Sequence, residues 1–339
     1  MKHINVALFV ADEGCPHRCS FCNQKTISGS VKRLDVQDVH NAVSKALGSR
    51  YETGEGEIAF FGGSFTAIER EYMLSLLKAA KEYIDKGLFK GIRISTRPDC
   101  INEEILHVLK KYGVTSIEIG CQSTDNRVLR LNERGHTAED IFSAARLIKS
   151  FGFELGVQMM TGLYGDSDEG AIETAKTLIS LNPDTARIYP TVVLEKTALH
   201  KLLEEGKYVP QTLEEAISLC SELLLMFHKN QIPVIRLGLH SGGNVEEGYI
   251  AGVYHPAFRE KCESAIYLKL LRKELSETSI KNPEVFVGSS FVSQLIGQGR
   301  ENIKALEAEG YSIKVKQSDT LKKYEIVLKA ASGCQGEKK

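Results

Sequence analysis

The sequence has little that would tie the chain to a membrane or to a secretory route. Its first apolar segment, at 4–10, is far too short to cross a bilayer, and no small-residue cleavage site follows it. Lys and Arg total 43 against 44 Asp and Glu, so the formal net charge is -1. We therefore expect a cytoplasmic protein with neither a membrane nor DNA as its partner.

The cysteines also lack the arrangement of a disulfide framework, which is typical of small secreted chains. Three of the eight, Cys15, Cys19 and Cys22, lie within eight residues, and the other five are scattered. Thiolates are soft ligands, so this cluster predicts an iron-sulfur or zinc site. No second CxxC pair is present to form zinc knuckles, but zinc completed by His17 or a distant residue stays open as the alternative.

Apolar, β-branched segments alternate with amphipathic helical patterns over most of the chain. Repeated βα units imply a parallel sheet with helices outside, and six or seven of them favour a partial barrel. Chemistry in such a barrel takes place at the carboxyl ends of the strands, and the cysteine cluster directly follows the first strand. The predicted strands are 4–10, 57–62, 91–95, 115–120, 154–160, 184–190 and 233–238.

A different organisation is predicted for the C-terminal part. Residues 241–280 are expected to form a connecting extension packed on the barrel, and 281–330 follow the order strand, helix, turn, helix, strand, strand. The tail at 331–339 is expected to be disordered. From residue 259 onward there are 15 basic against 11 acidic residues, which makes this region weakly basic. The fold class is thus α/β, with a partial (βα)6-type TIM-like barrel at 1–240 and a small α+β module.

The cysteine segment CPHRCSFC has the CxxxCxxC spacing of the radical S-adenosylmethionine superfamily, with an aromatic residue, Phe21, before the last cysteine. The segments FFGGSFT, ISTRPD, IEIGCQSTDNRVLRLNERGHT, GVQMMTGLYG, RIYPTVVLE and HPAFRE follow in an order that resembles the Elongator catalytic-subunit branch. The chain resembles the oxygen-independent coproporphyrinogen oxidases more distantly. These resemblances imply a 4Fe-4S cluster on Cys15, Cys19 and Cys22. They also imply reductive cleavage of S-adenosylmethionine to a 5′-deoxyadenosyl radical, with an external electron donor.

The resemblance further implies which residues hold S-adenosylmethionine. Gly62, Gly63 and Ser64 would present backbone carbonyls to the methionine amino group, which favours glycine because the backbone must approach closely. The positions that would hold the carboxylate and the ribose are Ser95, Thr96, Gln122 and Gln158. The positions that would border the adenine are Phe21, Tyr189 and Pro190.

Six other residues have both a functional and a structural interpretation. Basic side chains at the barrel mouth would bind carboxylate or phosphate, or would pair with Glu118 or Glu133. His255 would transfer protons or hold a turn, and Cys121 would relay a radical or fill the core. The residues with basic or imidazole side chains in matching motif positions are Arg97, Arg134, His136 and Arg187.

The Elongator-like resemblance implies tRNA as the substrate, with modification of the wobble uridine. Roughly sixty residues beyond 275 are too few for an acetyltransferase domain, so acetyl-coenzyme A chemistry is not implied. The C-terminal module resembles a KH RNA-binding domain, whose GxxG turn is GQGR here; Arg300 and Lys304 are the RNA-binding candidates. Two alternatives stay open: a radical enzyme acting on a small metabolite, and an RNA-binding protein whose cysteines hold a structural metal.

Overall fold

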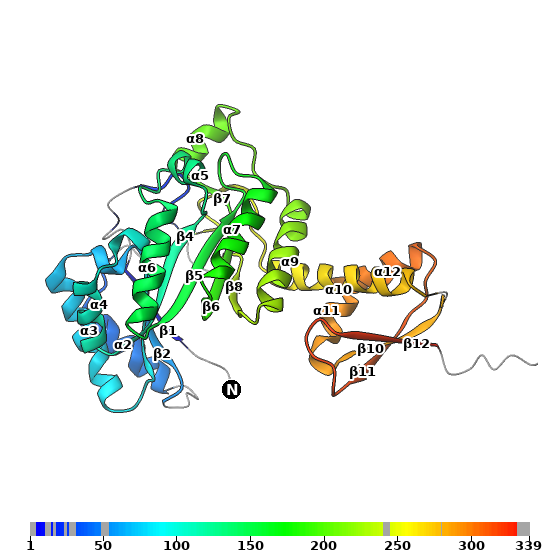
Figure 1. Cartoon of the computed structure of the whole chain (residues 1–339), viewed down its shortest axis with the longest axis horizontal. Coiled ribbons are helices and arrows are strands. Elements are labelled where there is room, and N and C mark those ends of the chain that lie inside the picture. Colours follow the sequence, from blue (N-terminus) through cyan, green and yellow to red (C-terminus); the bar gives the residue numbers. More distant parts are fainter. Residues whose placement is uncertain are drawn as a thin grey trace, which may run out of the picture. The chain divides into compact units, whose positions relative to one another are not determined.

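The computed structural model describes residues 5–10, 15, 18–23, 26, 32–48, 54–239, 245–278 and 280–330 (Figure 1). The chain divides into two compact units. One comprises Met1–Ala216 with Met226–Tyr254, and the other comprises Ile217–Leu225 with His255–Lys339. No helix among the described ranges is long and apolar enough to span a bilayer.

The first unit is built on a seven-stranded sheet with the order β1-β2-β3-β4-β5-β6-β8. All neighbouring strands in it are parallel, which confirms the predicted partial TIM-like barrel. The strands are β1 Asn5–Val10, β2 Glu57–Gly62, β3 Gly91–Thr96, β4 Val114–Gln122, β5 Glu154–Thr161, β6 Thr185–Pro190 and β8 Val234–Leu237.

Helices connect these strands and pack against the sheet (Figure 1). Their starts are set by local capping: Thr137 and Thr212 form capping boxes, and the Asn102 side chain accepts from the backbone N–H of Ile105. The helices are α2 Val36–Gly48, α3 Arg70–Asp85, α4 Glu103–Lys111, α5 Asn126–Leu131, α6 Ala138–Ser150, α7 Asp168–Ser180, α8 Ala198–Glu204 and α9 Leu213–Lys229. Two short 3-10 turns are η1 Phe65–Ala67 and η2 Pro98–Cys100.

The two faces of the sheet differ in polarity because side chains alternate along each strand. The apolar face is buried and includes Ile58, Phe60, Ile92, Ile94, Ile117, Ile119, Leu155, Val157 and Ile188. The inner face carries polar side chains, among them Glu57, Arg93, Ser95, Ser116, Glu118, Gln158 and Arg187. The inner face therefore carries the polar groups of the barrel, while the apolar face forms the core.

One strand pair was not predicted. β7 Val192–Leu194 pairs antiparallel with β9 Tyr249–Gly252. Gly252 has φ +93, and a Cβ there would lie 2.7 Å from the carbonyl oxygen of Thr191. Pairing across more than fifty residues through a glycine-rich segment leaves no periodic signal in the sequence, which explains the omission.

The second unit holds a three-stranded sheet with the order β11-β10-β12. β10 is parallel to β11 and antiparallel to β12. The strands are β10 Pro283–Gly288, β11 Lys314–Ser318 and β12 Ile326–Ala330, and the helices are α10 Phe258–Ser276, α11 Val292–Ile296 and α12 Glu301–Ala308. The turns η3 Ser289–Phe291 and η4 Gln298–Arg300 flank α11. The element order within 281–330 is the predicted one, and 331–339 lie outside the described residues.

Helix α10 contributes to the core of this second unit. Its Tyr267, Leu271 and Leu275 are fully buried against Val285 and Val287 of β10. The predicted connecting segment 241–280 is thus divided: its described residues up to 254 group with the first unit, and α10 groups with the second.

Candidate active site

The predicted site residues lie at or near the carboxyl ends of neighbouring strands. β2 ends at Gly62, β3 at Thr96, β4 at Gln122 and β6 at Pro190. Between the last two, Gln158 lies on β5. Parallel strands bring such ends to one edge of a sheet, which is where ligands bind in this architecture.

Cys19 is positioned by the hydrogen bonds of its neighbour Ser20. The Ser20 backbone N–H donates to Asn132 O at 3.1 Å, and its hydroxyl donates to Asn132 Oδ1 at 3.0 Å. The backbone N–H of Leu199 donates to Ser20 O at 2.8 Å. Asn132, which is fully buried, thus connects the cysteine segment to the end of α5. Sequence reasoning missed this pair because the two residues are 112 positions apart.

Two of the three clustered thiols meet next to two guanidinium groups. Cys19 is buried, and its sulfur accepts a hydrogen bond from Arg134 Nη1 at 3.1 Å. The Cys15 thiol is hydrogen-bonded to the backbone of Ser64 and interacts electrostatically with Cys19, Arg134 and Arg97. Burial raises the pKa of the Cys15 thiol above its ordinary value, and the two guanidinium groups offset this only in part.

The third cysteine does not complete a ligand set. Cys22 is half-buried, and its backbone N–H donates to Cys19 O at 3.0 Å. Within the ranges that the structure describes, no three His, Cys, Asp or Glu side chains are gathered so that they could hold a metal ion. This finding applies equally to iron and to the zinc alternative, and His17 lies outside the described residues. Among the described residues, Cys15, Cys19 and Cys22 are therefore not gathered into one metal-binding set.

The segment after β2 turns tightly against β1. Gly62 has φ +114, and a Cβ there would lie 2.6 Å from Val10 O. The backbone N–H of Gly63 donates to the same oxygen at 2.9 Å. Glycine is therefore required at position 62 by the backbone itself, whatever the segment binds.

Ser64 connects β2 to β3. Its buried hydroxyl lies 2.8 Å from Thr96 Oγ1 and accepts from the Arg97 backbone N–H at 3.2 Å. The Cys100 thiol is hydrogen-bonded to the Ser64 side chain, and Thr66 Oγ1 donates to Cys100 O at 2.7 Å. Sequence reasoning missed Cys100, which is isolated in the sequence but interacts electrostatically with Cys15 in the fold.

Several buried polar atoms near the ends of β3 and β4 have no hydrogen-bond partner within the described part of the chain. Gln122 also has φ +68, at a register shift between β4 and β5. Buried polar groups are nearly always paired, and strained backbone is common at functional sites, so the cluster indicates a place for a polar ligand. The atoms are Arg97 Nη1, Gln122 Oε1, Arg134 Nε and His136 Nδ1.

Some side chains at this edge, including ones with an unpaired atom, also have partners within the protein. Arg97 donates to both carboxylate oxygens of Asp99 at 2.9 Å and also to Arg134 O. Burial lowers the pKa of His136 to about 4, so its ring is neutral near pH 7 and cannot bind an anion as a cation. Burial raises the pKa of Cys121 to about 12, which favours its interpretation as a core thiol.

An ion-pair network lies along the inner face of the sheet. Arg93 donates to Glu57 at 2.7 Å and to Glu118 at 3.4 Å, and Arg187 donates to Glu118 at 2.8 Å. Arg187 thus forms the ion pair with Glu118 that was the structural interpretation of this residue. Gln158 Nε2 donates to Glu118 Oε2 at 2.9 Å and to Ser95 Oγ at 3.3 Å, so both predicted ligand-binding residues are already engaged.

The aromatic residues gather on one apolar cluster. Phe21 and Tyr189 are partly buried, and both pack against Val128, Met160 and Leu163. Pro190 is buried at the end of β6. The structure therefore brings two of the residues predicted to border an adenine ring, Phe21 and Tyr189, to one cluster.

The remaining predicted residues lie in the second unit. His255 Nδ1 accepts from the backbone N–H of Ala257 at 3.0 Å, just before α10, which supports its structural role. Arg300 and Lys304 are exposed. Arg300 has φ +64, a conformation that favours glycine, so the backbone there follows the GxxG pattern although the residue does not.

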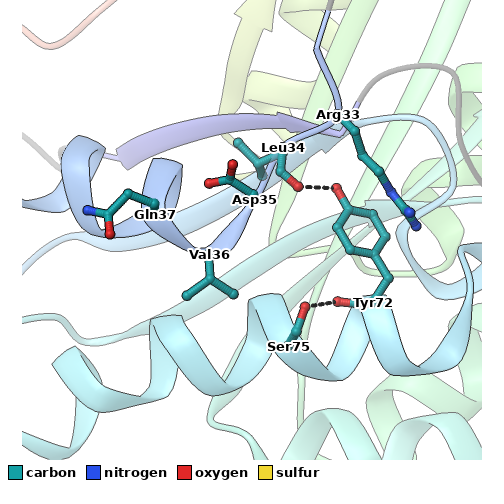
Figure 2. Close-up of a pocket in the computed structure, with 7 residues that line it drawn as sticks. All are labelled: Arg33, Leu34, Asp35, Val36, Gln37, Tyr72 and Ser75. Carbon is teal, nitrogen blue, oxygen red and sulfur yellow. Dashed lines mark hydrogen bonds between the residues drawn. The ribbon is translucent and has the colours of Figure 1, made fainter.

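A pocket of about 510 Å³ lies apart from these residues, beside the start of α2 and α3 (Figure 2). The Arg33 guanidinium is 3.8 Å from the centroid of the Tyr72 ring, and the Tyr72 hydroxyl donates to Leu34 O at 2.6 Å. None of the predicted site residues lines this pocket. Its lining residues are Arg33, Leu34, Asp35, Val36, Gln37, Tyr72 and Ser75.

Two family models match the chain in succession. The model of the Radical SAM superfamily matches residues 12–178, and that of the Radical_SAM C-terminal domain matches residues 183–267. The chain belongs to the radical SAM superfamily. The two matches together cover about three quarters of this radical SAM protein, and both the cysteine segment and the strand ends described above fall within them.

Two known relatives of this radical SAM protein are longer than it is. It is 30% identical over 256 residues to the tRNA uridine(34) acetyltransferase of Methanocaldococcus infernus, which covers 64% of this chain and 48% of the relative. It is 30% identical over 190 residues to Elongator complex protein 3 of Homo sapiens, and this alignment covers 50% of this chain and 35% of the relative. The chain thus spans about half the length, or less, of these curated relatives.

A solved structure supports the fold. The archaeal Elp3 of Methanocaldococcus infernus with an N-terminal deletion aligns with a TM-score of 0.62 and 24% identity. The alignment covers 80% of this chain and 63% of that chain.

Proposed function

We propose that this radical SAM protein binds a 4Fe-4S cluster through Cys15, Cys19 and Cys22 and cleaves S-adenosylmethionine reductively in order to modify tRNA. The observation that carries the proposal is the meeting of Cys15 and Cys19 at the carboxyl edge of the sheet, beside buried polar atoms that lack partners. Closure of Cys22 onto this pair is part of the proposal.

The donor set fits an iron-sulfur cluster chemically. Thiolates are its usual ligands, and three of them leave one iron open for another ligand. When bound, such a cluster supplies the electron for reductive cleavage. An external donor then returns an electron to the cluster. Arg134 and Arg97 would offset the negative charge of the site, because both guanidinium groups already interact with the thiols.

The residues of the chain would bind and orient S-adenosylmethionine. Gln122 is the best-placed polar residue, because its buried Oε1 is unpaired and can accept from a ribose hydroxyl. Ser95 and Gln158 would have to exchange their mutual hydrogen bond for one to the ligand. Phe21 and Tyr189 would pack against the adenine ring, with the apolar cluster behind them.

The choice of tRNA rests on the relatives and on the second unit. The first relative is named for acetylation at uridine 34 of tRNA, so we propose the wobble uridine as the site of modification. Arg300 would contact the RNA from the turn between α11 and α12, and Lys304 would do so from α12. The principal alternative is a small metabolite as the substrate.

Anaerobic reconstitution tests the enzymatic part of this proposal. We expect about four irons per chain and release of 5′-deoxyadenosine with a chemical reductant. Cys19→Ala should abolish both, whereas Cys220→Ala, a buried cysteine of the second unit, should retain both. Zinc in the protein, with no 5′-deoxyadenosine under reducing, oxygen-free conditions, would contradict the proposal.

Comparison of the modified nucleosides in total tRNA, with and without the gene, tests the substrate. We expect a uridine modification to disappear when the gene is deleted. An unchanged nucleoside profile would overturn tRNA as the substrate and would favour the metabolite alternative.

A further inference from the structure

The three-stranded sheet of the second unit has two unlike faces. Helices α10, α11 and α12 lie along one side of it (Figure 1), where Val285 and Val287 of β10 are fully buried with Leu295 and Leu306. Since side chains alternate along a strand, the neighbouring residues of β10 point to the other side. The strand register adds residues of β11 and β12 to that side. We call it the open sheet face; it comprises Glu284, Phe286, Lys314, Lys316, Val327 and Lys329.

An aromatic ring lies at the centre of the open sheet face. Phe286 is on the central strand and is paired with Lys316 of β11 and with Val327 of β12. It is only half-buried, and Val327 beside it is 39% exposed. The helices of its own unit therefore leave this ring accessible, although they bury the opposite face completely.

Lysine side chains surround the ring. Lys329 Nζ lies 4.8 Å from the centroid of the Phe286 ring. Lys314 and Lys316 keep 70% and 40% of their side-chain surface exposed, and their Nζ atoms lie 3.9 and 3.7 Å from Glu284 Oε1. Three cations therefore face one carboxylate, and the open sheet face carries net positive charge.

This combination fits the chemistry of single-stranded nucleic acid. A base can stack on an exposed aromatic ring, and lysines can contact the phosphates on either side. A β-sheet face with aromatic residues is one of the recurring surfaces on which proteins bind unpaired RNA. An apolar protein partner would leave the excess positive charge of the three lysines over Glu284 without a counter-charge, so the charge of the surface favours a polyanion.

We propose that the open sheet face binds an unpaired segment of RNA, with Phe286 stacked on a base and the three lysines at the phosphates. This inference rests on the proposed function for the identity of the substrate. It concerns a different surface from the turn between α11 and α12. In that turn the acidic Glu301 follows Arg300, and the Glu301 side chain lies 2.7 Å from where a Cβ on Gly297 would be.

Fluorescence anisotropy of the reconstituted protein with a labelled oligouridylate of about ten nucleotides tests the proposal. Phe286→Ala should weaken binding about tenfold or more, because a stacked base is lost. Phe286→Tyr keeps the ring and should bind as the unchanged protein does. Lys316→Gln and Lys329→Gln should each reduce the slope of log Kd against log salt by about 0.7.

Arg300→Ala is the comparison variant, because it removes a cation that the proposed function also places at the RNA and leaves the open sheet face intact. Loss of binding in Arg300→Ala with none in Phe286→Ala would overturn the proposal in favour of the turn. Equal binding by all variants, with unchanged salt slopes, would also overturn it. Release of 5′-deoxyadenosine is measured in parallel without RNA, so failure of the proposed function is seen separately from failure of this surface.

Discussion

Gly62 shows how far a single backbone position constrains the candidate site. Its φ of +114 is reached readily only by glycine, and the carbonyl oxygen of Val10 fills the space of a Cβ. The turn that carries Ser64 therefore depends on the absence of a side chain two residues earlier.

Gly62→Ala should lower the free energy of unfolding by about 2 kcal/mol or more, because strain and a backbone clash add. Urea denaturation at neutral pH measures this. Gly48→Ala is the control: nothing lies within 4 Å of a Cβ there, so its cost should be close to zero. Equal stability of the two variants would show that the turn can relax.

Asp166 is a second residue whose environment makes a measurable difference. Burial raises its pKa to about 6, and its Oδ2 has no partner among the described residues. The folded state therefore holds the proton more tightly than the unfolded state does. Between the ordinary pKa of 3.8 and about 6, stability must fall as the pH rises.

Asp166→Asn removes this charge and should flatten the pH dependence. Relative to the unchanged protein, the variant should gain about 1 to 2 kcal/mol of unfolding free energy near pH 8 and little near pH 4. Denaturation curves at several pH values measure the difference. If the variant loses as much unfolding free energy between pH 4 and pH 8 as the unchanged protein does, the assigned pKa is contradicted.

At the scale of elements, the strands of the barrel are joined by charge as well as by backbone hydrogen bonds. Arg93 of β3 bridges Glu57 of β2 and Glu118 of β4. Burial opposes ionisation of Glu57, but Arg93 and the hydroxyl groups of Ser116 and Thr115 outweigh it and hold its pKa below the ordinary value. The inner face thus stays polar without unpaired charges.

Arg93→Met should destabilise the protein by about 3 to 5 kcal/mol, because it leaves the buried carboxylate of Glu57 without its cation. Thermal or chemical unfolding measures the loss. The control is Arg70→Ala, which breaks a pair with Glu104 whose side chains are 42% and 79% exposed, and which should cost less than about 1 kcal/mol. Similar losses of unfolding free energy in the two variants would mean that the buried ion pairs of Arg93 stabilise the protein no more than an exposed ion pair does.

At the scale of the whole molecule, each unit has its own hydrophobic core. The second unit packs Tyr267, Leu271 and Leu306 around β10, whereas the first buries Leu106 of α4 with the apolar face of its sheet. Because the two cores are separate, we expect each unit to unfold locally without unfolding of the other.

Leu306→Ala and Leu106→Ala are matched changes, since both side chains are fully buried. Each should cost about 2 to 5 kcal/mol in its own unit. Hydrogen exchange should accelerate mainly in β10–β12 for the first variant and mainly in β3–β5 for the second. Equal acceleration in both units for either variant would show that they unfold together.

Local patterns predicted the strands of the barrel well, since β2 spans 57–62 in both the sequence analysis and the structure. Alternation and helical periodicity report burial directly, and burial is what forms the core. The same patterns missed β7 and β9, and they assigned α10 to a connection between parts rather than to the core of the second unit. Both features depend on partners that are distant in the sequence.

The sequence alone determined the family, the strand-and-helix order and the cysteine segment, because spacing and periodicity are properties of the chain itself. Only the tertiary structure decided which side chains meet: Cys19 with Arg134, Ser20 with Asn132, and Phe286 with Lys329. These contacts join residues from different strands and loops, and such pairs are set by the register and curvature of sheets, which no local pattern encodes.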